Sequence, residues 1–283
     1  MNNSSAKRLS EILALEIKER YGVDSVEAVR AKIEELILSD PSSTTFDQYL
    51  QLSKTKSHNA EWQKIIEKIT IHESYFQRNE NILNSVAKTV EQILSEKKTL
   101  RMWSVPCATG EEAYDLAFIA TERVYYQKYG TTTLNDKLLE DLSLDHVYIY
   151  GTDISETSLK HAKLGQYNDL TMGALRKLDP VRRRYFFTQN PEYYEVKPQI
   201  KRMVKFVVTN VMDPPLQYNF DIILCRNMLI YFGDEQKKRC QENLAQALAP
   251  GGYLFLGSVD QFLLNPDDFI QHTDEQSIWY QKK

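Results

Sequence analysis

The sequence contains little cysteine, and its few cysteines follow no pattern. Among 283 residues there are three, Cys107, Cys225 and Cys240, at scattered positions. An odd number of widely spaced cysteines argues against a disulfide framework and gives no pair at zinc-ligand spacing. We therefore expect a protein of a reducing cytoplasm, with no metal site.

The sequence also lacks a long apolar run and a marked excess of either charge. No stretch is apolar for the roughly 20 residues that a membrane-spanning helix needs. A net charge of -4 gives no general attraction to nucleic acid or to anionic lipid. We therefore expect no membrane insertion and no nucleic-acid partner. With 42% hydrophobic and 26% charged residues, the chain has the composition of a globular protein with a sizeable core, in one large or two modest domains.

Glycine is scarce where a dinucleotide site would need it. Residues 100–114 predict a short strand, a turn of small residues and a helix, the unit that binds nucleotides in open α/β sheets. The turn holds only Gly110, whereas a dinucleotide fingerprint has three glycines, and Glu111 at the helix start disfavours a phosphate. S-adenosylmethionine, a nucleoside without phosphates, fits better, because Glu111 would face its cationic end. An ordinary strand-to-helix turn explains the same residues about equally well.

Two segments precede this unit. Residues 1–70 predict a small helical domain, with apolar residues at helical spacing and ten Lys or Arg against eleven Asp or Glu. Residues 71–98 predict a linker that includes a helix over about 82–94. The first part of this linker carries Tyr75, Phe76 and Arg78. It either packs as a simple connection or lies over a cofactor pocket.

Residues 99–283 predict an α/β domain with a parallel sheet, because strand and helix signals alternate. The expected strands are 100–105, 147–151, 204–208, 221–225 and 253–256, with a terminal antiparallel pair over 269–272 and 277–280. Polar residues follow the parallel strands, where open α/β sheets bind ligands: Thr109, Asp153, Asn210, Arg226 and Asn227. The Asp153 carboxylate suits a role in binding two ribose hydroxyls. The alternative is that Asp153 only caps a turn or a helix.

A basic stretch interrupts the domain over about residues 172–203. Between residues 172 and 205, nine Lys or Arg face three acids, with Tyr and Phe between them. A solvated helix followed by a small hairpin is one interpretation. The other is a docking surface for an acidic macromolecule.

Three motifs resemble the chemotaxis receptor methyltransferases of the CheR type, which are protein-glutamate O-methyltransferases. Cys107-Ala108-Thr109-Gly110-Glu111-Glu112-Ala113-Tyr114 is similar to the family's C-S-T-G-E-E-P-Y, and Gly151-Thr152-Asp153-Ile154 to its A-T-D-I. Cys225-Arg226-Asn227-Met228-Leu229-Ile230-Tyr231-Phe232 is similar to C-R-N-V-x-I-Y-F. The resemblance implies a Rossmann-like class I S-adenosylmethionine-dependent methyltransferase sheet, a small N-terminal all-helical domain and a small inserted β subdomain.

The resemblance also implies roles for single residues. Glu111 would lie near the methionine part of S-adenosylmethionine and Asp153 on its ribose. Asn210 and Val211 would lie beside the adenine, and Arg226 and Asn227 would line the same pocket. The family's N-x-T-x-F-F-R segment corresponds to residues 72–78, which adds His72, Ser74 and Arg78 to the cofactor site.

The implied reaction is methyl transfer to glutamate carboxylates in the cytoplasmic domain of chemotaxis receptors, with Arg78 and Tyr231 as catalytic residues and a monomeric enzyme. Three alternatives stay open at the level of sequence. The first is an interaction protein that binds the cofactor without methylating receptors. The second is a methyltransferase for a small molecule or RNA. The third, a nicotinamide-dependent dehydrogenase, is disfavoured by the single glycine and Glu111.

Overall fold

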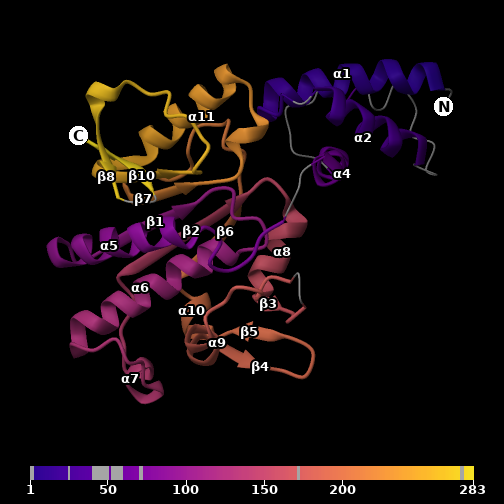
Figure 1. The fold of residues 1–283 in the computed structure, drawn as a ribbon. Helices are drawn as coiled ribbons and strands as arrows, with labels where there is room; N and C mark the ends of the chain where they lie inside the picture. Colours follow the sequence, from indigo (N-terminus) through magenta and orange to yellow (C-terminus); the bar gives the residue numbers. More distant parts are fainter. Residues whose placement is uncertain are drawn as a thin grey trace.

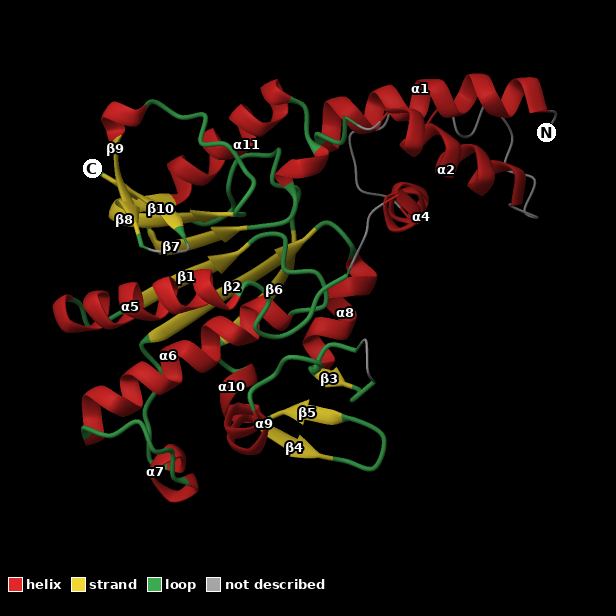
Figure 2. Ribbon diagram, viewed as in Figure 1, coloured by secondary structure: helices red, strands yellow, loops and turns green. Residues whose placement is uncertain are grey.

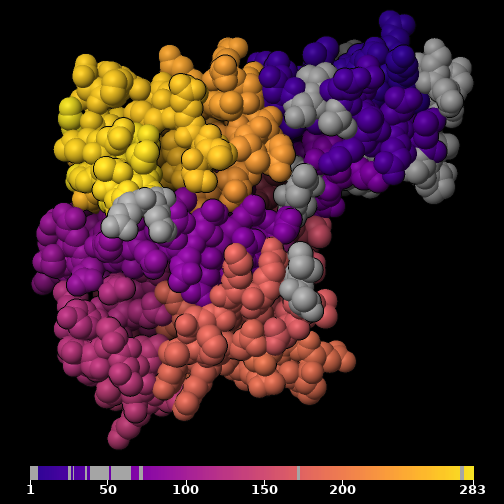
Figure 3. All heavy atoms as spheres, viewed as in Figure 1, coloured from indigo at the N-terminus to yellow at the C-terminus, as the bar shows by residue number. Residues whose placement is uncertain are grey.

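The computed structural model describes residues 3–24, 26–39, 51, 60–69, 73–170, 173–274 and 277–283. Its N-terminal part consists of helices α1 (Asn3–Tyr21), α2 (Val26–Ser39) and α4 (Ala60–Ile69). Their apolar faces share one buried cluster that includes Leu13, Ile33 and Ile65. Figure 1 shows these helices as a lobe beside the main body, and Figure 3 shows this lobe in contact with it.

The main body is built on a seven-stranded sheet in the order β6-β2-β1-β7-β8-β10-β9. The parallel strands are β1 (Leu100–Ser104), β2 (Val147–Asp153), β6 (Val204–Val208), β7 (Phe220–Cys225) and β8 (Leu248–Leu256). The antiparallel strands β9 (Phe269–Thr273) and β10 (Ile278–Lys282) close one edge. This is the expected α/β architecture, and the expected terminal antiparallel pair is confirmed.

Helices cover the two faces of the sheet unequally (Figure 2). On one face lie α5 (Glu80–Glu96), α6 (Glu111–Tyr129) and α8 (Glu156–Leu164), and on the other lies α11 (Asp234–Ala247). Because side chains alternate along a strand, Met102 packs with the first group, and Trp103 points to the opposite face of the sheet, into the cluster that also includes Leu244 of α11. The remaining short elements are α7 (Asp136–Glu140), α10 (Pro198–Lys201), η1 (Leu229–Tyr231) and η2 (Pro266–Asp268).

The basic stretch folds as a small β subdomain. Helix α9 (Pro180–Phe186) leads into the hairpin of β4 (Phe187–Gln189) and β5 (Tyr194–Val196). This agrees with the predicted helix and hairpin. A third strand, β3 (Gln166–Tyr167), pairs with β5. Two residues are too short to give a strand signal, so sequence reasoning did not anticipate it.

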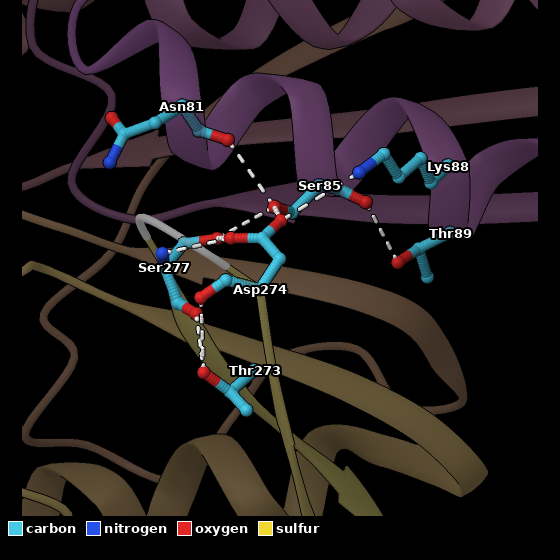
Figure 4. Close-up of polar contacts among 7 residues, drawn as sticks. All are labelled: Asn81, Ser85, Lys88, Thr89, Thr273, Asp274 and Ser277. Atoms are coloured by element: carbon cyan, nitrogen blue, oxygen red, sulfur yellow. Dashed lines mark hydrogen bonds and ion pairs between the residues drawn. The ribbon is translucent and has the colours of Figure 1, made fainter.

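A polar network ties the C-terminal hairpin to α5 (Figure 4). The Asp274 carboxylate accepts hydrogen bonds from the Ser85 hydroxyl at 2.6 Å and from the amide and hydroxyl of Ser277 at 2.9 and 2.7 Å. Ser85 is fully buried. The linker helix α5 is therefore held between α6, β1 and this hairpin.

Candidate functional site

The carboxyl ends of β1, β2, β6 and β7 surround a pocket that faces the N-terminal lobe. In Figure 2 the arrowheads of these strands point towards that lobe. The pocket has about 910 Å³ of empty space, including the part open to solvent. Its walls come from the strand ends and from the lobe. They include Pro106, Ala108, Thr152, Asp153, Ile154, Thr209, Asn210, Val211, Asn227, Met228, Tyr231, Tyr21, Val23, Ile66 and Ile69.

Asp153 lies at the end of β2 with its side chain buried. One carboxylate oxygen accepts a hydrogen bond from the Ala108 amide at 2.9 Å, and the other accepts one from the Ser155 amide at 2.9 Å. The cap role and the ribose role predicted for Asp153 are therefore compatible. Asp153 fixes the turn after β1 and the start of α8, and it also lines the pocket.

Asn210 and Val211 follow β6 and line the pocket together. The Asn210 side chain donates to the carbonyl of Arg20 in α1 at 2.8 Å and accepts from the Met212 amide at 3.0 Å. It thus joins the sheet edge to the N-terminal lobe. No local pattern indicates this contact, because it links positions 190 residues apart.

Asn227 and Tyr231 form the wall contributed by the segment after β7. Asn227 has a φ of 59°, a left-handed conformation that asparagine tolerates better than most residues. The Tyr231 carbonyl accepts a hydrogen bond from the Asp24 amide at 2.8 Å. Val23 and Phe232 pair as an isolated antiparallel bridge. This wall is therefore fixed to the connection between α1 and α2.

Glu111 lies in a buried site beside the turn and is not among the residues that line the pocket. Its two carboxylate oxygens lie 2.8 and 2.9 Å from the Thr109 hydroxyl, which donates to them. Burial raises the pKa of Glu111, while hydrogen bonds from Thr109 and Ser74 and the charge of Arg176 act in the opposite direction. The structure thus brings the predicted residues Ser74 and Glu111 together.

Arg226 is buried, and it too does not line the pocket. Its guanidinium forms an ion pair with Glu112 at 2.9 Å and donates to the Asn79 side chain at 2.9 Å and to the Arg78 carbonyl. Burial raises the pKa of Glu112, and Arg226 opposes this shift. In the structure Arg226 connects the end of β7 to α6 and to the start of α5.

Arg78 belongs to a group of cations around the half-buried ring of Tyr75. The guanidinium carbon of Arg176 lies 3.7 Å from the ring centroid. Arg78 and Lys177 approach the same centroid, each to 5.6 Å. Glu73 pairs with Arg176 at 2.9 Å, and Arg78 donates to the Glu73 carbonyl at 2.9 Å. We call Tyr75, Arg78, Arg176 and Lys177 the Tyr75 cluster.

The other charges of the basic stretch are mostly neutralised nearby. Four more cations of this stretch form ion pairs: Arg182 with Glu122, Arg183 with Asp169, Lys197 with Asp136 and Lys201 with Glu195. The stretch therefore does not form one broad basic surface, and its positive charge is divided among smaller groups of residues. Of these, the Tyr75 cluster is the one beside Glu111.

Asp115 is a buried acid that sequence reasoning missed. One of its oxygens accepts a hydrogen bond from the Gln77 amide at 2.7 Å, and the other has no partner among the described residues. Burial raises its pKa to about 7, against the effect of Arg182 and the Gln77 amide. Asp115 thereby holds the segment 73–79 on α6. Phe76, which packs against Phe118, Tyr167 and Phe187, anchors the same segment.

One predicted site residue, His72, lies outside the described residues. Of the predicted linker 71–98, the described part starts at residue 73. Within that part no residue lines the pocket, because α5 packs against β1 and α6. The pocket is instead covered by residues of the N-terminal lobe.

The residues present fit a nucleoside cofactor. The pocket offers apolar walls, such as Pro106, Val211 and Met228, for a flat ring, and it places the carboxylate of Asp153 at the end of β2. A carboxylate at the end of the second strand suits ribose hydroxyls. The buried acid Glu111 in the neighbouring turn suits a cationic group.

Comparisons with known proteins agree with this fit. The family model described as "CheR methyltransferase, SAM binding domain" matches residues 72–278. A chemotaxis protein methyltransferase from Vibrio parahaemolyticus is 34% identical over 69% of this chain and 66% of its own length. Another from Listeria innocua is 33% identical over 73% of this chain and 71% of its own. A third, from Campylobacter jejuni, is 28% identical over 98% of this chain and 97% of its own.

These matches confirm the predicted fold class and the S-adenosylmethionine cofactor, because the matched family domain is defined by binding this cofactor. The chain spans about two thirds of the length of the Vibrio relative that it matches. No described helix is long and apolar enough to cross a membrane. Since the family model covers most of the chain, the protein belongs to the CheR methyltransferase family.

Proposed function

We propose that this protein transfers the methyl group of S-adenosylmethionine to glutamate side chains of chemotaxis receptors. The observation that carries the proposal is the arrangement at the carboxyl edge of the sheet. Asp153, Asn210 and Asn227 line one pocket there, and Glu111, Ser74 and Arg78 lie in the adjoining turn and segment. The names of the relatives support a role in chemotaxis.

Each predicted residue has a place in this proposal. Asp153 would hold the ribose hydroxyls, and Asn210 and Val211 would flank the adenine. Glu111 and Ser74, with His72, would hold the methionine end, and Asn227 would line the pocket. Arg226 would act on the cofactor site through Arg78 and Glu112, which it contacts. The cofactor supplies an electrophilic methyl group bonded to a positively charged sulfur.

The reaction needs no general base from the protein. A glutamate has a pKa of about 4.3 and is already ionised at neutral pH. The protein has to align the carboxylate with the methyl group and to exclude water, since opposite charges are neutralised in the transition state. Arg78 would steer the acceptor carboxylate by charge-assisted hydrogen bonds, and Tyr231 would place its hydroxyl beside the same carboxylate.

The substrate region of the receptor would approach at the Tyr75 cluster. Arg176 and Lys177 add positive charge beside Arg78, and the N-terminal lobe offers no basic excess. Such a cluster favours an acidic partner. The partner would be the cytoplasmic domain of a receptor, so the enzyme would act in the cytoplasm. It would act as a monomer and would not bind nucleic acid.

Calorimetric titration with S-adenosylmethionine and S-adenosylhomocysteine tests the cofactor site. We expect binding by the native chain and a loss of at least about tenfold in affinity for Asp153→Ala. Asp153→Asn removes the charge and keeps an acceptor for one of the two backbone amides, and urea unfolding of both variants separates a loss of ligand binding from a loss of folding. Asp145→Ala, at an exposed acid on the loop before β2, is the matched control.

The methyl-transfer step is tested by incubating the native chain with labelled S-adenosylmethionine and a receptor cytoplasmic domain. We expect base-labile label on glutamates. If the native chain bound neither S-adenosylmethionine nor S-adenosylhomocysteine, the proposed methyltransferase activity would be refuted. Binding without transfer to any receptor would favour an interaction protein, and label on RNA would favour another substrate class.

A further inference from the structure

One half of the sheet has a face without a covering helix among the described residues. Trp103, Tyr150 and Lys205 form one row across β1, β2 and β6, because they are register partners. Helix α11 packs on β8 instead. The chain between β6 and β7 cannot supply a helix over this row, since it contains Pro214 and Pro215. It crosses as a loop.

The loop leaves a second pocket above this row. Its walls are Trp103, Tyr150, Thr152, Lys205, Val207, Thr209, Leu216, Gln217 and Phe220, and it has about 530 Å³ of empty space, including the part open to solvent. Thr152 and Thr209 separate it from the pocket of the candidate cofactor site, because they line both.

Aromatic rings form the floor of this second pocket. The rings of Trp103 and Phe220 are stacked with centroids 5.2 Å apart, and Tyr150 meets Phe220 edge-on at 5.4 Å. The indole N–H of Trp103 is already bonded to the Thr152 hydroxyl at 2.8 Å. Trp103 and Phe220 are almost fully buried, so the ring that the floor presents to a ligand is that of half-buried Tyr150, whose face suits a planar ring.

Two cations flank the rings. The Lys205 ammonium lies 5.9 Å from the Tyr150 centroid, and the Arg101 guanidinium lies 5.7 Å from the Phe220 centroid. Neither forms an ion pair with a carboxylate in the part of the chain that the structure describes. Lys205 is exposed at the pocket rim. A ring that bears an anionic group would match both features.

We propose that this pocket is a binding site for a flat aromatic anion, with its ring over Tyr150 and its carboxylate at Lys205. The site is distinct from the cofactor site and does not depend on the proposed methyl transfer. Because Thr152 directly precedes Asp153 and accepts the hydrogen bond of Trp103, the ligand would sit behind the wall that holds Asp153.

The test uses 2-naphthoate as the probe and 2-naphthalenemethanol as its uncharged partner, titrated into the native chain by calorimetry or followed by ligand-detected NMR. We expect a dissociation constant of about 1 mM or tighter for naphthoate. The alcohol should bind at least about fivefold more weakly. Lys205→Gln should weaken naphthoate by a similar factor and leave the alcohol unchanged. Lys163→Gln, at an exposed lysine of α8, should change neither.

A second titration, with S-adenosylhomocysteine at saturation, locates the probe. Naphthoate should still bind, because the two pockets are separate. Competition between the ligands would overturn the proposal by placing the probe in the cofactor pocket. No saturable binding, or binding that is equal for the alcohol or unchanged in Lys205→Gln, would also overturn it. None of these results depends on whether the chain methylates a receptor.

Discussion

At the scale of single residues, two adjacent acids at the start of α6 have different partners. Successive residues of a helix point about 100° apart. Glu111 therefore faces the Thr109 hydroxyl, and Glu112 faces the Arg226 guanidinium and the Ser104 hydroxyl. The sequence indicates two acids that suit a helix N-terminus. It does not indicate that Arg226, more than 100 positions later, pairs with the second acid, whereas the first is bonded by the hydroxyl groups of Thr109 and Ser74.

Arg78 provides the residue-level prediction about catalysis. Its side chain is half-buried beside Tyr75, and its carbonyl, which a substitution leaves in place, accepts the hydrogen bond from Arg226. We expect Arg78→Ala to lower kcat for receptor methylation by about 100-fold or more, because a charge-assisted contact made in the transition state is worth several kcal/mol. Affinity for S-adenosylhomocysteine should fall much less.

Steady-state kinetics and calorimetry on the same preparation check this prediction. Arg184→Ala is the control, because Arg184 is an exposed cation of α9 and lies against Tyr185 instead of Tyr75. Equal losses in turnover and affinity for Arg78→Ala would show that Arg78 serves the cofactor alone. Unchanged turnover would remove it from the site.

Asp115 provides a prediction about pH. Burial raises its pKa in the folded protein from an ordinary 3.8 to about 7. Between these two values the folded state binds more protons than the unfolded state, so the free energy of unfolding falls as the pH rises through that window. The contribution amounts to about 4 kcal/mol over the whole window, at about 1.4 kcal/mol for each pH unit between the two pKa values.

Asp115→Asn should therefore lose much of the decline in stability between pH 5 and pH 7.5, because the amide keeps an acceptor for the Gln77 amide and does not ionise. Urea unfolding at several pH values measures the slope. Asp145→Asn, at an exposed acid, should leave the slope as in the native chain. A slope that Asp115→Asn does not change would show that Asp115 is ionised throughout this range.

At the scale of elements, the contact between α5 and the C-terminal hairpin rests on Asp274 (Figure 4). We expect Asp274→Ala to lower the free energy of unfolding by about 1 to 3 kcal/mol, since Ser85 and Ser277 lose their charged acceptor in a buried place. Lys88→Ala should change it by less than about 0.5 kcal/mol, because that ammonium lies 3.9 Å from Asp274 and is 73% exposed. Denaturant melts compare the two variants, and similar values for both would contradict a special role for the buried network.

The same elements show what a sequence can predict. The strand 204–208 matches β6 residue for residue, and the strand expected over 221–225 differs from β7 by one residue. Both are short and mainly apolar, as buried parallel strands are. Strand β3 and the network of Asp274 depend on tertiary partners, so local pattern gives no signal for them. The same holds for Asp115, whose burial follows from the packing of the segment 73–79 on α6.

At the scale of the whole molecule, the N-terminal lobe completes the cofactor pocket. Tyr21, Val23, Ile66 and Ile69 line it, and the connection between α1 and α2 is fixed to the segment after β7. Candidate site residues could be read from strand ends, because parallel strands bring their carboxyl ends to one edge. The lobe residues could not, since nothing in a helical pattern indicates which distant surface it meets.

Gly22 sets the distance between the lobe and the sheet. Its φ is 79°, and a side-chain carbon there would lie 2.9 Å from two carbons of the Phe232 ring. Gly130, at the end of α6, has a φ of 68° and open space around it. Both glycines have a positive φ, a conformation that costs an alanine about 1 kcal/mol. Only Gly22 packs against Phe232 in the segment after β7.

We therefore expect Gly22→Ala to lose more stability than Gly130→Ala, because the contact with Phe232 adds to the shared backbone cost, and we expect the two variants to differ in ligand binding. In Gly22→Ala the methyl group pushes Val23 and Tyr21 away from Phe232, which opens the pocket and should weaken S-adenosylhomocysteine by at least about fivefold in calorimetry. Gly130→Ala should bind the ligand like the native chain. Equal affinities in the two variants would mean that the lobe moves freely against the sheet and that the strand ends alone hold the cofactor.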